Sequence, residues 1–343
     1  MGYLILDEIA HINDVIHQKH KATELKEDDV LLNITGASIG RTAIATKEIE
    51  GGNVNQHVCI IRANSKVNPK FLCNYIQTKK IQNYIQSLQT GGSREGLNFE
   101  QIRSFPISLP NIAEQNKIAQ LLDKLNERIA TQNKIIDKLQ SLIKGINQRV
   151  FMNDGINYKL GEVCEIRSGY SGNQLLSKKG LKVSRIETIS EHKVNLERVG
   201  YVAPFESSEN YKLQVGDILF SNINSVEYIG NTAFIDKDYD LYHGMNLLRL
   251  TPNNMVVIPF YLYLLLNTNR MLNRFKTICN KAVSQASINQ TELGKTVVQI
   301  PLINTQKQIC KLYQALYTKL ETENHAKSLF QNQKQYLLRQ MFI

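Results

Sequence analysis

Two turns, about 190 residues apart, carry side chains that can donate and accept hydrogen bonds. The first turn spans 35–41 and the second spans 222–228. Groups of these types can contact the edges of nucleic-acid bases, with Arg suited to guanine and Asn to adenine. The candidates for base recognition are therefore Thr35, Ser38 and Arg41 in the first turn, and Asn222, Asn224 and Ser225 in the second.

A second pair of turns, TGGSR at 90–94 and KAVSQ at 281–285, keeps its position while differing in chemistry. Such divergence is expected if two related domains recognise different base sequences. The alternative is that both turns are merely solvated, and the same alternative holds for a Lys-Lys pair further along the chain. Further candidates for DNA contact are Ser93, Arg94, Ser284, Gln285, Lys178 and Lys179. The basic stretches 79–80 and 270–276 are expected to touch phosphate or solvent.

Residues that support catalysis or metal binding are not arranged for either task. His17 and His20 stand three apart with no third ligand in view, and the five cysteines form no CxxC pair. The segment TGASIG at 35–40 lacks the third glycine of a dinucleotide-binding loop, and neither a Walker-type phosphate loop nor the Pro-Pro-aromatic motif of a base-extruding methyltransferase occurs. We expect no catalytic, cofactor or metal site, and we interpret Gly36 and Gly40 as turn glycines.

The composition is that of a folded protein with an anionic partner. The chain has 343 residues, 42% of them hydrophobic and 21% charged, with a formal charge of +10 and a pI near 9.2. This length suggests two domains, and the excess of Lys and Arg favours a partner that bears phosphates. The start has no basic region followed by an apolar run, and the longest apolar stretch, near 260–266, is too short to span a bilayer. We expect a soluble, cytoplasmic protein.

The sequence contains a long internal repeat, because it aligns with itself at an offset of about 190 residues. DVL at 29–31 matches DIL at 217–219, GRTA at 40–43 matches GNTA at 230–233, and PKFL at 69–72 matches PFYL at 259–262. So long a period indicates a duplicated domain, since the repeats of solenoids span about 20 to 50 residues. Residues 158–181 have no partner in the first copy, which is therefore expected to lack about 25 residues at its start.

Each copy shows the same order of secondary-structure signals. β-rich segments with Gly and Asn turns come first, followed by a helix, a loop, a strand that ends at Pro, and a long helix. In the second copy, strands are expected in GDILFSNINS, NTAFIDKD and HGMNLLRLTP. A helix is expected at 259–279, with its copy at 69–88.

Two long helices close the two copies. From Glu114 to Val150 no proline occurs, and hydrophobic residues alternate at spacings of 3 and 4, which is typical of a coiled coil. Such a helix would be about 55 Å long. The second helix, 306–342, is less regular because Glu323, Lys327 and Lys334 interrupt its series. We expect the two helices to pair antiparallel and to hold two domains apart; one face of a helical bundle is the alternative.

Several segments resemble the specificity subunits of type I restriction-modification systems. They are KLGEVCEIRSG at 159–169, GDILFS at 216–221, and the pair LPNIAEQNKI and IPLINTQKQI at 109–118 and 300–309. In that family, a series of Pro, Gln and Ile opens each spacer helix. The resemblance implies an α+β fold with a pseudo-twofold internal repeat, in which two α/β target-recognition domains are separated by two long antiparallel coiled-coil helices. The implied divisions are 1–110, 111–157, 158–301 and 302–343.

The same resemblance implies a non-catalytic subunit that reads a bipartite target in double-stranded DNA. Its partners would be two methyltransferase subunits and, in the full complex, restriction subunits. Those partners would methylate adenine and would hold the methyl donor and ATP, so this chain would bind no cofactor. Two alternatives stay open: the recognition component of a type II methyltransferase-nuclease, and a coiled-coil scaffold that does not bind DNA.

Overall fold

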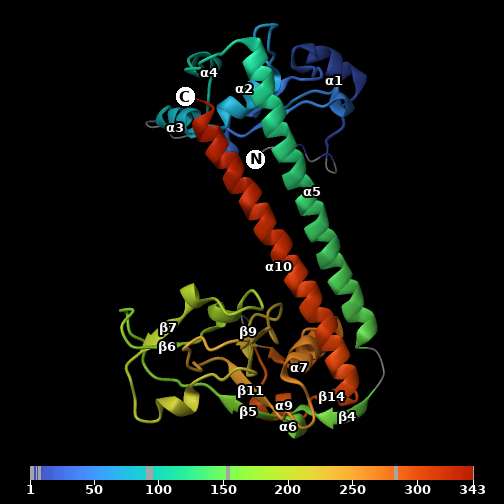
Figure 1. Ribbon diagram of the computed structural model, residues 1–343, viewed down its shortest axis with the longest axis vertical. Helices are drawn as coiled ribbons and strands as arrows, with labels where there is room; N and C mark the ends of the chain where they lie inside the picture. The colour runs from blue at the N-terminus through green and yellow to red at the C-terminus, as the bar shows by residue number, and fades with distance from the viewer. Residues whose placement is uncertain are drawn as a thin grey trace. The chain divides into compact units, whose positions relative to one another are not determined.

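The computed structural model describes residues 4, 6, 9–89, 96–151, 155–281 and 285–342. The chain divides into two compact units. Unit 1 consists of Met1–Ile136 and Thr322–Ile343, and unit 2 of Asp137–Glu321. Two long helices, α5 (Ile112–Val150) and α10 (Ile303–Gln340), each contribute one part to unit 1 and another part to unit 2 (Figure 1).

Unit 1 is built on an antiparallel sheet with the strand order β2-β1-β3. The strands are β1 (Val30–Asn33), β2 (Thr42–Ile44) and β3 (Val58–Ile61), and a short helix, α1 (Asp14–Lys19), precedes them. Alternate residues of β1 enter different cores, as the pleat requires. Val30 and Leu32 belong to the main core with the helices, whereas Leu31 belongs to a smaller cluster with Leu25 and Ala45.

Unit 2 repeats this sheet and adds a strand to it. Its order is β10-β8-β11-β5, formed by β8 (Ile218–Phe220), β10 (Thr232–Phe234), β11 (Leu248–Pro252) and β5 (Cys164–Ser168). The register agrees between the copies, because Leu31 pairs with Ala43 in unit 1 and Leu219 pairs with Ala233 in unit 2. The three strands expected in the second copy are thus confirmed. The added strand β5 comes from the segment without a counterpart in the first copy.

The remaining elements of unit 2 are short. Two pairs of strands lie outside the main sheet: β4 (Ile156–Lys159) with β14 (Val297–Ile300), and β6 (Leu181–Val183) with β7 (Gly200–Val202). A third small sheet has the order β12-β13-β9, from β12 (Asn280–Lys281), β13 (Ala286–Ser287) and β9 (Ile223–Asn224). The short helices α6 (Leu160–Val163) and α9 (Gln290–Gly294) complete it.

Each sheet packs against a pair of helices, where a single helix was expected. The segment 69–88 forms α2 (Pro69–Ile76) and α3 (Lys79–Ser87), and 259–279 forms α7 (Pro259–Leu266) and α8 (Asn269–Ile278). The expectation of one helix is wrong because Thr78 and Thr268 adopt extended backbone angles, and each side chain caps the second helix. In unit 1 a further short helix, α4 (Phe99–Arg103), follows.

A buried glutamine fastens the start of each long helix to the preceding domain. Gln115 accepts a hydrogen bond from Asn68 N at 2.9 Å and donates to the carbonyls of Lys66 and Pro110. Gln306 accepts from Ile258 N at 2.8 Å and donates to the carbonyls of Val256 and Pro301. The Pro, Gln and Ile series that repeats in the sequence therefore has a structural role: its glutamine saturates three backbone groups at the helix–domain junction.

Within each unit, the parts of α5 and α10 run antiparallel, as expected. In unit 1, Gln132 contacts Glu323, and Lys334 donates to Asn126, so rising numbers in α5 meet falling numbers in α10. In unit 2, Tyr313 donates to Asn147, while Ile309 shares a core with Val150. Both helix ends are also part of the globular cores, because Leu122 and Leu338 pack with Phe71 in unit 1. No helix of the described residues is long and apolar enough to cross a membrane.

The helix interface of unit 1 contains a buried amine, that of Lys334, which is 1% exposed. Burial lowers its pKa from 10.5 to about 8, although Cys73 and Asp123 act in the opposite direction. Between these two values the unfolded chain binds more protons than the folded chain, so this lysine makes unit 1 more stable as the pH rises through that window. Below about pH 8 the burial penalty is fully present.

We expect Lys334→Met to remove this rise in the free energy of unfolding. The measurement is urea unfolding of both proteins between about pH 7 and pH 10. The difference between their free energies of unfolding at each pH cancels the contribution of the other titrating groups. The free energy of unfolding of the wild type should increase relative to that of the variant as the pH rises. Parallel pH profiles would contradict the burial of a charged amine at this position.

Candidate functional site

The two turns that carry polar candidates have the same backbone geometry. In unit 1, Asn33 N donates to Arg41 O at 2.8 Å and Gly40 N donates to Asn33 O at 2.9 Å. In unit 2, Ser221 N donates to Asn231 O at 2.8 Å and Gly230 N to Ser221 O at 2.9 Å. Both glycines have left-handed backbone angles, φ 82° for Gly40 and 84° for Gly230, which confirms the interpretation of Gly40 as a turn glycine.

The segment that follows the second turn lies beside the first turn in both units. Leu97 N donates to Ile34 O at 2.8 Å, and Ile288 N donates to Asn222 O at 2.9 Å. In unit 2 this contact extends into a small sheet, in which Asn224 pairs with Ala286. In unit 2 the structure therefore brings Gln285 close to the candidates of the first turn, which lie about 60 residues earlier in the sequence. In unit 2, the turn at 222–228 and the adjoining residues 281 and 285–288 form one surface, here called the composite surface.

In unit 1, the candidates differ in how much of their hydrogen-bonding capacity is used within the fold. Thr35 Oγ1 lies 2.7 Å from Nδ1 of His57, and Ser38 Oγ accepts from Asn33 Nδ2 at 2.8 Å. Arg41 is exposed at the end of the turn. Its guanidinium is thus the group of this turn best placed for an external contact. Ser93 and Arg94 lie outside the described residues.

In unit 2, the side chains of the two asparagines make hydrogen bonds within the fold. Asn222 Nδ2 donates to Ile288 O at 3.3 Å, and Asn224 bonds Ser221 Oγ and the Ser225 amide. These amides hold the two adjoining turns in place. The exposed side chains at the same surface include those of Ser225, Gln285 and Lys281. Ser284 lies outside the described residues.

Lys178 and Lys179 are exposed but belong to another part of unit 2. They precede β6, and the neighbouring Leu175 N donates to Tyr201 O at 2.7 Å. Their segment is therefore held to β7, and the described contacts do not connect it to the turn at 222–225. The lysines stay candidates for phosphate contact, separate from the composite surface.

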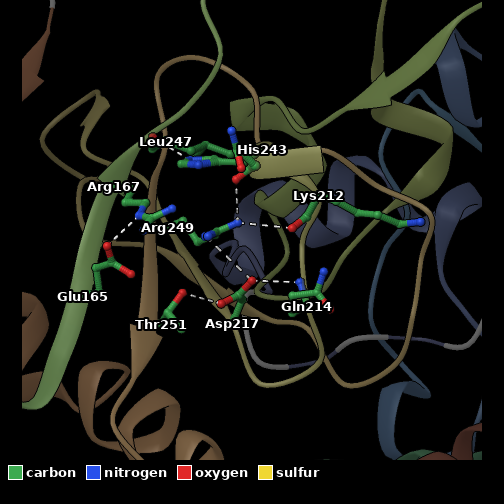
Figure 2. Close-up of polar contacts among 10 residues, drawn as sticks. Glu165, Arg167, Lys212, Gln214, Asp217, His243, Leu247, Arg249 and Thr251 are labelled. Atoms are coloured by element: carbon green, nitrogen blue, oxygen red, sulfur yellow. Dashed lines mark hydrogen bonds and ion pairs between the residues drawn. The ribbon is translucent and has the colours of Figure 1, made fainter. Parts of the chain in front are cut away.

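A buried ionic network links segments of the main sheet of unit 2 (Figure 2). Asp217 is 2% exposed and accepts from Thr251 Oγ1 at 2.6 Å and from Gln214 N at 2.8 Å. Arg249 Nε lies 3.8 Å from the same carboxylate, and Nη1 donates to the carbonyls of Lys212 and Asn210. The network ties β8, β11 and the segment before β8 together.

Sequence reasoning missed this network, although one signal for it existed. Arg249 stands between two leucines in an apolar strand, and a buried arginine requires a carboxylate partner. The guanidinium borders a cavity of 510 Å³ that is also lined by Arg167, Ser168, Asn210, His243 and Gln290. Burial lowers the pKa of His243 to about 4 despite its hydrogen bond to Leu247 O. The imidazole is therefore neutral at physiological pH.

The residues considered for metal or nucleophilic chemistry are placed in structural roles. His17 Nδ1 lies 2.7 Å from Asn53 Oδ1, and among the residues that the structure describes no three His, Cys, Asp or Glu side chains gather to hold a metal ion. The five cysteines are buried free thiols. Burial raises the pKa of Cys164 to about 12, which keeps it protonated.

These features define a class of protein: a duplicated α+β chain whose two units share one sheet register, one glycine turn bonded to a later segment, and one glutamine junction to a long helix. The comparisons identify the family. The chain matches the type I restriction modification DNA specificity domain over residues 7–141 and 153–329, so it belongs to that family.

Among its relatives is a putative type I restriction enzyme MjaX specificity subunit from Methanocaldococcus jannaschii, 39% identical over 188 residues that cover 54% of this chain and 44% of the relative. The match thus spans less than half of that relative. The EcoKI specificity subunit of Escherichia coli is 22% identical, covering 94% of this chain and 75% of the relative. A crystal structure of a type I S subunit from M. genitalium shares the fold, with a TM-score of 0.61, 17% identity and coverage of 92% and 83%.

Proposed function

We propose that this chain is the DNA-recognition subunit of a type I restriction-modification complex and has no catalytic step of its own. Each unit would read one half of a bipartite target. The observation that carries the proposal is the first turn, which keeps its backbone bonds in both units, including the bond from the neighbouring segment, while its exposed side chains differ. Arg41 is exposed in unit 1, whereas Ser225 is exposed in unit 2 with Lys281 and Gln285 beside it. One framework with two chemistries suits two different half-sites.

The partners follow from this role. The chain would direct methyltransferase subunits and, in the full complex, restriction subunits to its target, and its two equivalent units suggest two methyltransferase copies. The net charge of +10 would favour the DNA backbone through counterion release. A protein that works on chromosomal DNA with free thiols would act in the cytoplasm. The divisions 1–110, 111–157, 158–301 and 302–343 stay our proposal for its functional segments.

The test is adenine-methylome sequencing of cells that carry this chain with its methyltransferase partner, compared with cells that carry the methyltransferase alone. We expect a bipartite motif with a fixed gap that appears only with this chain. Lys281→Ala combined with Gln285→Ala should relax one half-site, with discrimination at a contacted base reduced about tenfold or more, and should leave the other half-site intact. Arg41→Ala should affect the opposite half-site.

Lys237→Ala is the matched control, because this exposed lysine follows β10 and its loss changes the charge equally without altering the turns. It should leave the motif unchanged. If the methylated motif stayed the same in all the turn variants, another surface of the chain would have to recognise the DNA. No new methylation with the wild-type chain would contradict the proposed function.

A further inference from the structure

The paired helices contain polar side chains at positions that a coiled coil usually fills with apolar ones. In unit 1, the nearly fully buried Lys334 of α10 donates to Asn126 Oδ1 of α5 at 2.7 Å. In unit 2, the fully buried Tyr313 of α10 donates its hydroxyl to Asn147 of α5. Polar groups in such an interface are tolerated when they are paired and are costly when they are not.

The repeat shows that the Lys334–Asn126 pair occurs in only one unit. At the repeat offset, Ile143 of α5 is equivalent to Lys334, and Tyr317 of α10 is equivalent to Asn126. Ile143 is buried in the core of unit 2, and Tyr317 packs against that core. An amine and an amide in unit 1 are thus replaced by an aliphatic and an aromatic side chain in unit 2.

The Tyr313–Asn147 pair, by contrast, is present in unit 2 and replaced in unit 1. Its equivalents in unit 1 are Leu122 of α5 and Leu338 of α10, and both leucines are buried in the core of that unit. Each unit therefore has one polar pair where the other has an apolar pair. In each case one member comes from α5 and the other from α10.

We propose that these two polar pairs make α5 select α10 as its partner and reject a second copy of α5, and likewise make α10 reject a second α10. Each helix is the repeat equivalent of the other, so a second α5 could take the place of α10 in the same antiparallel register. Asn126 would then face Ile143, and Asn147 would face Leu122. Both amides would be placed against apolar side chains.

Pairing of α10 with a second α10 meets a similar obstacle. Lys334 would face Tyr317 instead of an amide carbonyl, and Tyr313 would face Leu338, which offers no acceptor. The apolar seam cannot supply this discrimination by itself, since residues such as Leu125, Ile129 and Ile136 keep a regular heptad series that would also suit a second α5. The interaction surface that the pairs define fits the opposite repeat helix only.

The experiment gives both units the same residues at the positions of the two polar pairs, in the full-length chain. Asn126→Tyr with Lys334→Ile gives unit 1 the residues that unit 2 has at the equivalent positions, Tyr317 and Ile143. Leu122→Tyr with Leu338→Asn likewise gives unit 1 the equivalents of Tyr313 and Asn147. Room for a tyrosine at 126 exists, because Asn126 borders a cavity of 470 Å³ that Cys73 and Lys334 also line. Lys134→Cys in every version supplies a reporter, since this exposed position of α5 would lie beside its own copy in an α5–α5 pair.

Each protein is unfolded in denaturant, refolded, and treated with a short bismaleimide cross-linker, to which the buried native cysteines are poorly accessible. We expect the variant with all four substitutions, called the fourfold variant, to yield at least tenfold more chain dimer cross-linked through position 134. The reference is the chain that carries Lys134→Cys alone. Equal yields would overturn the proposal.

Two further variants keep the test decisive. Asn126→Lys with Lys334→Asn exchanges the polar pair between the helices without changing composition, and it should stay as monomeric as the wild type. Asn126→Tyr with Lys334→Ile alone should give an intermediate dimer yield if the fourfold variant does not refold. Dimer formation by the exchanged variant, or none by the double variant, would show that complementarity of the pairs does not set the choice of partner.

Discussion

Asp217→Ala is expected to destabilise unit 2 by about 3–5 kcal/mol, because it removes one member of a buried ion pair and leaves Arg249 uncompensated. The Arg249 side chain is 10% exposed, so water can compensate for the lost carboxylate only in part, from the cavity that the guanidinium borders. Thr251 Oγ1 and the amide of Gln214 lose their acceptor at the same time. Hydrogen exchange measured by mass spectrometry should show faster exchange in β8 and β11 than in the wild type.

The repeat provides a matched control at the equivalent residue of unit 1. Asp29 is also buried, and it accepts from Lys26 N at 2.8 Å and from Arg62 at 2.7 Å. Burial pushes its pKa up, but the hydrogen bonds from Arg62 and Lys26 outweigh burial and lower the pKa below 3.8. Since the Arg62 side chain is 47% exposed, water can solvate it after Asp29→Ala. We expect the smaller loss there, about 1–2 kcal/mol, and equal losses at both sites would refute the role given to burial.

Gln306→Leu is expected to cost about 2–4 kcal/mol, since it removes three hydrogen bonds in a site that is fully buried. The Ile258 amide and the carbonyls of Val256 and Pro301 would be left without this partner. Urea unfolding should show a lower midpoint, and hydrogen exchange should quicken at the start of α7.

Gln308→Leu is the control for that substitution, because Gln308 is two residues further along the same helix and is exposed. It should change the free energy of unfolding by less than about 0.5 kcal/mol. Gln115→Leu should reproduce the large effect in unit 1, where the same three bonds exist. A small effect at both buried glutamines would mean that the junction is held by the apolar cores alone.

The regular parts of the fold could be predicted from the sequence. Strands such as Ile218–Phe220 and the length of α5 follow from hydrophobic spacing, and the repeat revealed the duplication. The break between α7 and α8 could not be predicted in this way, because Thr268 lies inside a sequence with helical spacing throughout. Its capping bond to Met271 N exists only once the backbone has turned.

The polar surface was harder to predict than the fold. Residue types pointed to the turn at 222–225, but they could not show that the amide of Asn222 is directed at Ile288, a residue distant in sequence. Lys334 was recognisable as an interruption of the apolar series, whereas its partner Asn126 depends on the alignment of two helices. Contacts between segments that are distant in the sequence are set by packing, and local patterns do not encode them.

Because unit 1 contains both ends of the chain, the two units are expected to fold in a set order during synthesis on the ribosome. Phe342 packs against the rings of Phe71 and Tyr75, with centroids 5.0 and 5.3 Å away, and Leu338 belongs to the same core. All residues of unit 2 lie between 137 and 321, so its core can form before the last residues leave the exit tunnel. Unit 1 is synthesised first but has to wait for the end of the chain. Ribosome-bound chains that carry a C-terminal linker just long enough to bring residue 321, but not residue 338, out of the exit tunnel should therefore contain a protease-resistant second unit and a protease-sensitive first one.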